Sequence, residues 1–171
     1  GRRRLVGLRG VSASYPLLGQ VELGGGSRLA DALRPVGGVA GVAVEQALLD
    51  RLGLRIGDRF LVGNVPVAAR AVLLGEPDRL SRGFALGPRV LARIATVREG
   101  GFLAPGLPFG ETARIALRPG LGMAAARRAI AEALPKGKYV VRDRDQAATG
   151  FSRLIDQLEY FLGFIGLASL V

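Results

Sequence analysis

Residues 39–74 constrain the fold more than any other stretch of the chain. They open with an apolar run, and the apolar residues that follow recur at helical spacing: Val44, Leu48, Leu49 and Leu52. Gly53 comes next, where a helix commonly ends in a left-handed residue. Residues 60–62 and 65–74 then read as two strands joined by a Gly-Asn turn. The sequence predicts a helix, a glycine stop and a β-hairpin, a unit that can nucleate a small domain.

Composition excludes several kinds of chemistry. The chain has 171 residues, 49% of them hydrophobic, which is enough for one domain or two small lobes with a buried core. It contains no cysteine and no histidine. Disulfides and thiolate metal sites are therefore excluded, and so is a hydrolase that depends on a histidine base. A small enzyme of another kind is disfavoured for the same reason.

The formal net charge is +10, and nearly all the positive charge is arginine, since the only lysines are Lys136 and Lys138. Such a charge favours nucleic acid or an anionic lipid surface as a partner. However, arginines and acids alternate in residues 142–145, and only 6% of residues are aromatic. We therefore expect no nucleic-acid partner. A basic nucleic-acid-binding module is the alternative hypothesis, which binding that weakens steeply with salt would support.

The acidic residues do not form a recognisable cation-binding motif at residues 143–154. Asp143 and Asp145 would lie on one side of a strand, but arginines flank both, so a solvated run of charges is favoured. An EF-hand loop does not fit here, because Ala148 stands where glycine is needed and Leu154 where the last acid is needed.

Two acids elsewhere, Glu76 and Asp78, flank a proline and could hold a hard cation, but no further oxygen ligand lies nearby in the sequence. The glycines at 24–26 lack the Gly-Lys-Ser/Thr of a phosphate loop. No histidine is present to activate the serines considered as nucleophiles, Ser12, Ser14, Ser27, Ser81 and Ser152. The sequence predicts no catalytic, cofactor-binding or metal-binding residues.

The rest of the chain has weaker patterns. Strands are expected at 4–12, 20–23, 112–117 and 139–142, and helices at 27–33, 92–97 and 123–134, the first of these being a short helix or an irregular hairpin tip. The last helix and its flanking strands predict a right-handed parallel βαβ crossover. The loop at 99–110 carries apolar residues, Phe102, Leu103, Leu107 and Phe109. It is either a contact surface or a cover for an edge of the core.

Residues 160–171 contain no charge. A membrane span needs roughly 20 apolar residues, so this segment alone is too short to be one. Tyr160 stands where polar sequence gives way to apolar sequence, as interfacial aromatics do, and small residues at 163, 166 and 169 suit helix packing in lipid. We expect a stalk helix from residue 151 that continues into the first part of a transmembrane helix. A buried C-terminal core helix is the alternative.

Residues 42–73 resemble the extracytoplasmic domain of FtsX/MacB-like permeases of ABC transport systems. In that domain a secondary-structure element is followed by an LGLxxGD motif and then by a pair of strands. Several segments resemble the YbbP-like subgroup more narrowly: Tyr15-Pro16-Leu17 with Gly19, Glu76-Pro77-Asp78-Arg79, Gly83-Phe84, Gly87-Pro88-Arg89-Val90-Leu91 and Val141-Arg142-Asp143-Arg144. Residues 161–171 resemble the start of the transmembrane helix that follows this domain. The resemblance extends from about residue 10 to residue 171.

The resemblance implies an α+β fold: a two-lobed periplasmic core domain followed by a C-terminal helix that enters the membrane. Residues 1–35 would belong to the first lobe, 36–100 to a small inserted β-rich lobe, 101–150 to the βαβ part of the first lobe, and 151–171 to the stalk. It also implies a location in the bacterial inner membrane, with the domain facing the periplasm.

The implied function is to couple ATP hydrolysis by a cytoplasmic ABC ATPase to the movement or extraction of a lipid-like or protein cargo. The implied partners are that ATPase, the membrane, and a periplasmic lipase-like or other protein. A homodimer or pseudo-dimer is implied in the full transporter. No cofactor is expected in the domain itself.

Overall fold

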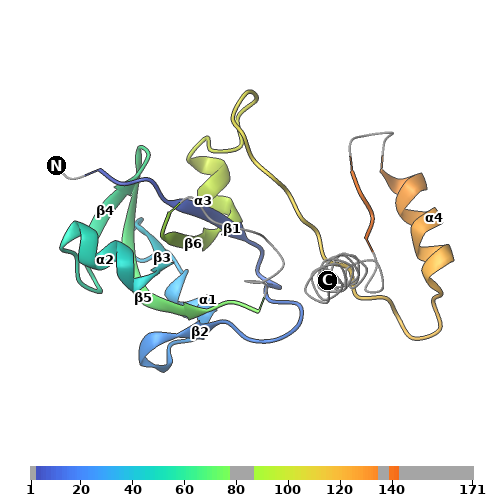
Figure 1. Cartoon of the computed structure of the whole chain (residues 1–171), viewed down its shortest axis with the longest axis horizontal. Helices are drawn as coiled ribbons and strands as arrows, with labels where there is room; N and C mark the ends of the chain where they lie inside the picture. Colours follow the sequence, from blue (N-terminus) through green and yellow to red (C-terminus); the bar gives the residue numbers. More distant parts are fainter. Residues whose placement is uncertain (1–2, 78–86, 135–138, 143–171) are drawn as a thin grey trace, which may run out of the picture. The chain divides into compact units, whose positions relative to one another are not determined.

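The computed structural model describes residues 3–77, 87–134 and 139–142, and it divides into two compact units. Unit 1 is Gly1–Arg114 and unit 2 is Ile115–Val171. Figure 1 shows the elements of both units along the chain. Their bounds are β1 Gly7–Val11, β2 Glu22–Leu23, the 3₁₀ turn η1 Gly24–Gly26, α1 Leu29–Ala32, β3 Ala40–Val44, α2 Gln46–Leu52, β4 Arg59–Val62, β5 Val65–Gly75, β6 Arg89–Arg93, α3 Ile94–Glu99 and α4 Met123–Ala133.

Unit 1 is built on one six-stranded mixed sheet with the order β1-β6-β3-β5-β2, in which β4 also pairs with β5. β1 runs parallel to β6, and β3 runs parallel to β5, whereas β3 and β6 are antiparallel. The 11-residue strand β5 is long enough to pair with β4 through its first residues and with β2 through its last. The expected mixed α+β class is confirmed.

Apolar side chains on both faces of this sheet form the core. Successive strand residues point to opposite faces, and in β3 the side chains of Val42 and Val44 belong to one buried cluster while Ala43 belongs to another. The first cluster includes Leu48 of α2 and Val97 of α3. The second includes residues of α1 and its C-terminal end. Each face of the sheet is therefore covered by at least one helix.

The helix, glycine stop and hairpin predicted from residues 39–74 are confirmed, but Val44, which was counted in the helical spacing, is the last residue of strand β3, and α2 begins at Gln46. Gly53 ends α2 in the left-handed conformation, with φ of 70°, and the backbone N–H of Leu54 donates to the carbonyl of Leu49 at 2.9 Å. β4 and β5 then form an antiparallel hairpin closed by the pair Val62–Val65. Gly63 in the turn has φ of 56°, which side chains other than glycine seldom adopt.

Two predicted strands are wrong. Residues 112–117 and 139–142 are not strands, and no described strand pairs with either of them. Alternation of apolar and polar residues sets which face a strand would bury, but a strand also needs a hydrogen-bonded neighbour. The helix predicted between them is confirmed as α4, whose Ala126 is buried. The described residues therefore contain no βαβ crossover in this region.

The segments assigned by resemblance to different lobes share one sheet. β1 and β2, which lie before residue 35, pair with β6 and β5, which lie after it. The predicted stalk and membrane segment at 151–171 lies outside the described residues. Among the helices that are described, none has the length and apolar character needed to span a membrane.

The loop at 99–110 covers an edge of the core, which is one of the two roles considered for it. Phe102 and Leu103 pack against the buried core, and a Cβ added at Gly63 would lie 2.9 Å from the Phe102 ring. The ring therefore sits on the β4–β5 turn and covers the edge of the core. Leu107 and Phe109, by contrast, are exposed.

The two phenylalanines of this loop provide a matched test. We expect Phe102→Ala to lower the free energy of unfolding by about 2 kcal/mol, because the ring covers apolar side chains of β4 and β5. Phe109→Ala removes the same atoms from an exposed position, and we expect a change below about 0.5 kcal/mol. Urea unfolding followed by circular dichroism measures both. Equal effects would contradict the covering role of Phe102.

Candidate functional site: a buried carboxylate between two arginines

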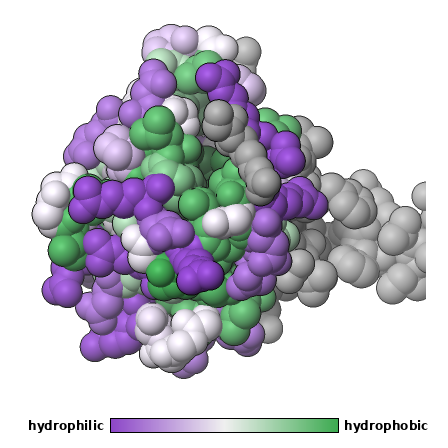
Figure 2. Space-filling model, turned by 90° about the vertical axis from the view of Figure 1, so that its left-hand side faces the viewer, coloured by the Kyte–Doolittle hydropathy of each residue, from purple (hydrophilic) through white to green (hydrophobic). Residues whose placement is uncertain are grey.

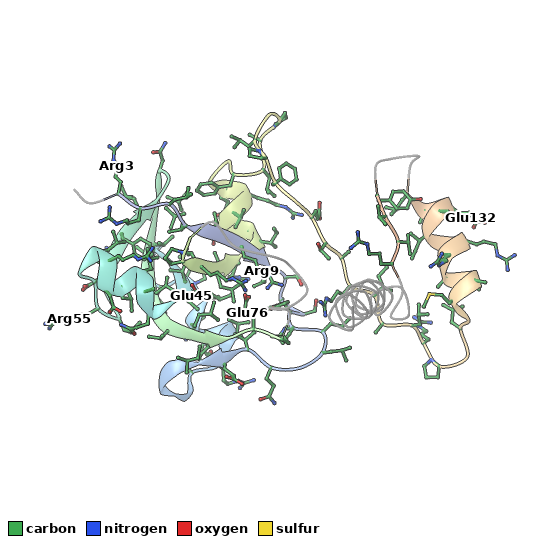
Figure 3. The ribbon with its side chains drawn as sticks, in the orientation of Figure 1. Arg3, Arg9, Glu45, Arg55, Glu76 and Glu132 are labelled. Carbon is green, nitrogen blue, oxygen red and sulfur yellow. The ribbon has the colours of Figure 1, made fainter. Side chains whose placement is uncertain are left out.

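Among the described residues of unit 1, the charged group that is buried is the carboxylate of Glu76, directly after the last residue of β5. Its side chain is only 2% exposed. Arg9 of β1 donates from Nη1 to Oε1 at 2.7 Å, and Arg89 of β6 donates from Nη1 to Oε2 at 2.8 Å. Figure 3 shows Arg9 and Glu76 pointing toward one another beneath β1. Each carboxylate oxygen therefore accepts a charge-assisted hydrogen bond from a different strand.

Tyr15 completes this group on the side of Arg9. Its hydroxyl donates to Oε1 of Glu76 at 3.4 Å, and the Arg9 guanidinium lies 4.5 Å from the centroid of its ring. This distance fits a cation–π interaction. The peptide bond from Tyr15 to Pro16 is cis. We call Arg9, Tyr15, Glu76 and Arg89 the Glu76 cluster.

Glu45 holds the cluster from another direction. It lies between β3 and α2, and its Oε2 accepts the backbone N–H of Arg89 at 3.1 Å. The backbone N–H of Glu45 donates in turn to the carbonyl of Arg89, also at 3.1 Å. The first residue of β6 is thus fixed through both its backbone and its side chain.

The cluster connects strands that are not neighbours in the sheet. β3 lies between β5 and β6, and β6 lies between β3 and β1. Glu76 at the end of β5 therefore joins that strand to β6 and β1 across β3. The side chains of Arg9 and Arg89 are 18% and 17% exposed, so both are largely buried. Such a group needs its counter-charge to be held in good geometry.

This arrangement supports a structural tie and not a reacting group. Both oxygens of Glu76 are engaged by guanidinium groups, so they are not arranged to bind the hard cation considered from the sequence, whose other candidate, Asp78, lies outside the described residues. The described residues also hold no group of three or more acids that could bind a metal ion. Of the serines considered as nucleophiles, Ser12 and Ser14 are exposed, with hydroxyl oxygens 3.0 Å apart.

Sequence reasoning did not predict the Glu76 cluster, although it named several of its members separately. Arg9 and Glu76 are 67 residues apart. One feature of β1 could have predicted it: Arg9 lies two residues before the buried Val11, so the two side chains are on the same face of the strand. An arginine in the buried phase of a strand indicates a buried acidic partner. Comparison of the chain with protein-family models, with curated proteins and with solved structures gives no match.

Proposed function

We propose that the chain is the periplasmic domain of an ABC transporter permease, coupling ATP hydrolysis by a partner ATPase to movement of a lipid-like or protein cargo. One observation carries the proposal. Three separate segments that carry the resemblance to YbbP-like permeases each supply a member of the Glu76 cluster, namely Tyr15, Glu76 and Arg89. Tyr15 and Arg89 both bind the carboxylate of Glu76, so the three segments meet at one place in the fold. Three unrelated chance similarities would not be expected to meet in this way.

The physical role of the domain in this proposal is mechanical. A domain that relays movement from membrane helices must be displaced as a rigid body. The sheet of unit 1 has the ties that this needs, since Glu76 links β5 to β1 and β6 while Glu45 links β6 to the β3–α2 junction. Chemistry on a bond is not part of the role.

The proposal also specifies where the protein is and what it contacts. The domain faces the periplasm, and the permease lies in the bacterial inner membrane. The ATPase is a separate cytoplasmic subunit, a lipase-like or other periplasmic protein is a further partner, and two such permease subunits or halves form the transporter.

Co-expression of the full-length protein with an ABC ATPase taken from an adjoining reading frame tests the proposal, and the lack of any such reading frame would count against it. We expect the permease to sediment with membranes and to bring the ATPase with it through purification in detergent. An ABC ATPase from an unrelated transporter is the control and is expected not to co-purify. A soluble monomeric product, or one that binds neither ATPase, would contradict the proposal.

A further inference from the structure

We propose that residues 55–61, the turn after α2 together with β4, form a surface that binds anionic phospholipid bilayers. Two arginines and two large apolar residues alternate along this short segment, all of them exposed: Arg55, Ile56, Arg59 and Leu61. Ile56 is 47% exposed and Leu61 is 66% exposed. Figure 2 faces the side of unit 1 that carries α2 and β4, where hydrophobic and hydrophilic residues lie interspersed. We call this segment the arginine–leucine edge.

The fold explains why these side chains point outward. In β4, Phe60 and Val62 belong to the side that packs on the core, so Arg59 and Leu61, which alternate with them, share the opposite side. The residue paired with Leu61 across the hairpin is Pro66, which is also exposed. Within the described sheet β4 pairs with β5 alone, so it is an edge strand. Leu61 therefore projects from a border of the sheet.

The arginine side chains of this edge are available to a ligand. No salt bridge joins Arg55 or Arg59 to any described residue. The nearby acid, Asp58, uses its carboxylate within the turn, where Oδ2 accepts the backbone N–H of Arg55 at 2.8 Å. Figure 3 shows the Arg55 side chain extending away from the ribbon. Two arginines without a salt bridge to any described residue thus lie within the same seven residues as two exposed aliphatic side chains.

A bilayer surface fits this combination better than other polyanions do. Guanidinium groups bind lipid phosphates, while leucine and isoleucine enter the boundary between headgroups and acyl chains. Nucleic acid would satisfy the arginines but would leave Ile56 and Leu61 against water, and the edge presents no exposed aromatic side chain on which bases could stack. The inference does not depend on the proposed transporter role, because it concerns binding by the domain alone.

Vesicle sedimentation tests the inference with the whole chain. The probes are vesicles of phosphatidylcholine alone and of phosphatidylcholine mixed with phosphatidylglycerol. We expect phosphatidylglycerol to raise the affinity for vesicles, and we expect salt to weaken this added affinity. Arg55→Gln/Arg59→Gln is expected to lower the affinity about 20-fold, since a basic residue near an anionic surface contributes roughly a factor of five. Every variant carries residues 160–171. Any affinity of these residues for lipid is therefore common to all variants, and the difference in affinity between variants reports on the substituted residues.

Matched controls separate this edge from the general positive charge. Arg28→Gln/Arg98→Gln removes the same charge from exposed positions elsewhere in unit 1, and we expect less than about a threefold loss. Leu61→Ser is expected to weaken binding, whereas Leu107→Ser, at another exposed leucine, is not. Equal losses in the two arginine pairs would overturn the inference, as would binding without phosphatidylglycerol dependence. Duplex DNA that binds as tightly as the mixed vesicles, with no effect of Leu61→Ser on either, would also overturn it.

Discussion

Glu76→Gln is expected to lower the free energy of unfolding by about 3–4 kcal/mol, one of the largest effects of any single substitution in unit 1. The change removes the one negative charge that Arg9 and Arg89 share, at distances of 2.7 and 2.8 Å. Both arginine side chains would remain less than one-fifth exposed and would lose the carboxylate that they share. Removing one partner of a buried ion pair typically costs 3–5 kcal/mol, roughly, because the remaining charge stays desolvated.

Urea unfolding measures this effect, and hydrogen exchange of the β3 and β5 amides assigns it to unit 1. Glu99→Gln is the matched control, because Glu99 is exposed at the end of α3 and neither of the salt bridges described includes it. We expect the control to change stability by less than about 0.5 kcal/mol. If Glu76→Gln has no larger effect than Glu99→Gln, the cluster is not an important tie in the fold.

The second large effect is expected at Gly41, a buried glycine within β3. A Cβ at this position would collide with the carbonyl oxygen of Ala32 at the end of α1, and it would lie 3.1 Å from the carbonyl oxygen of Arg34. Both obstacles are backbone atoms, so no side-chain rotation can relieve the overlap. We expect Gly41→Ala to lower the free energy of unfolding by about 3 kcal/mol, since α1 would have to move off the sheet.

Gly110→Ala is the control for this substitution. Gly110 also has no positive φ, and an added Cβ there meets nothing within 4 Å. We expect its effect to stay below about 0.5 kcal/mol in the same urea experiment. Hydrogen exchange provides a second readout, because displacement of α1 accelerates exchange in β3. A Gly41→Ala protein as stable as the Gly110→Ala protein would show that α1 does not pack on β3 as described.

Local patterns predicted those parts of the fold that depend on local interactions. The helical spacing before Gly53 and the turn at Gly63 each act over a few residues, and α2 and the β4–β5 hairpin were predicted from them. Residues 112–117 show the limit of this reasoning. Their alternation is as regular as that of a strand, but the presence of a partner strand is a property of the whole fold and not of the segment.

The Glu76 cluster could be predicted only in pieces for the same reason. Its members come from β1, from the end of β5 and from the start of β6, and the sheet order that brings them together includes a crossover that no short motif encodes. Resemblance to a family marked Tyr15, Glu76 and Arg89 as members of separate motifs. Only the arrangement of the strands showed that these motifs share one carboxylate.

A double-mutant cycle between Glu76 and Arg89 tests most directly that the Glu76 cluster ties the sheet together. The free energy of unfolding is measured for Glu76→Ala, Arg89→Ala and the double variant. Because the two side chains bind each other at 2.8 Å, we expect the double variant to be more stable than the sum of the single effects predicts, by about 2 kcal/mol. Effects that add within about 0.5 kcal/mol would show that the two residues do not interact in solution, and would remove the observation on which the proposed function depends.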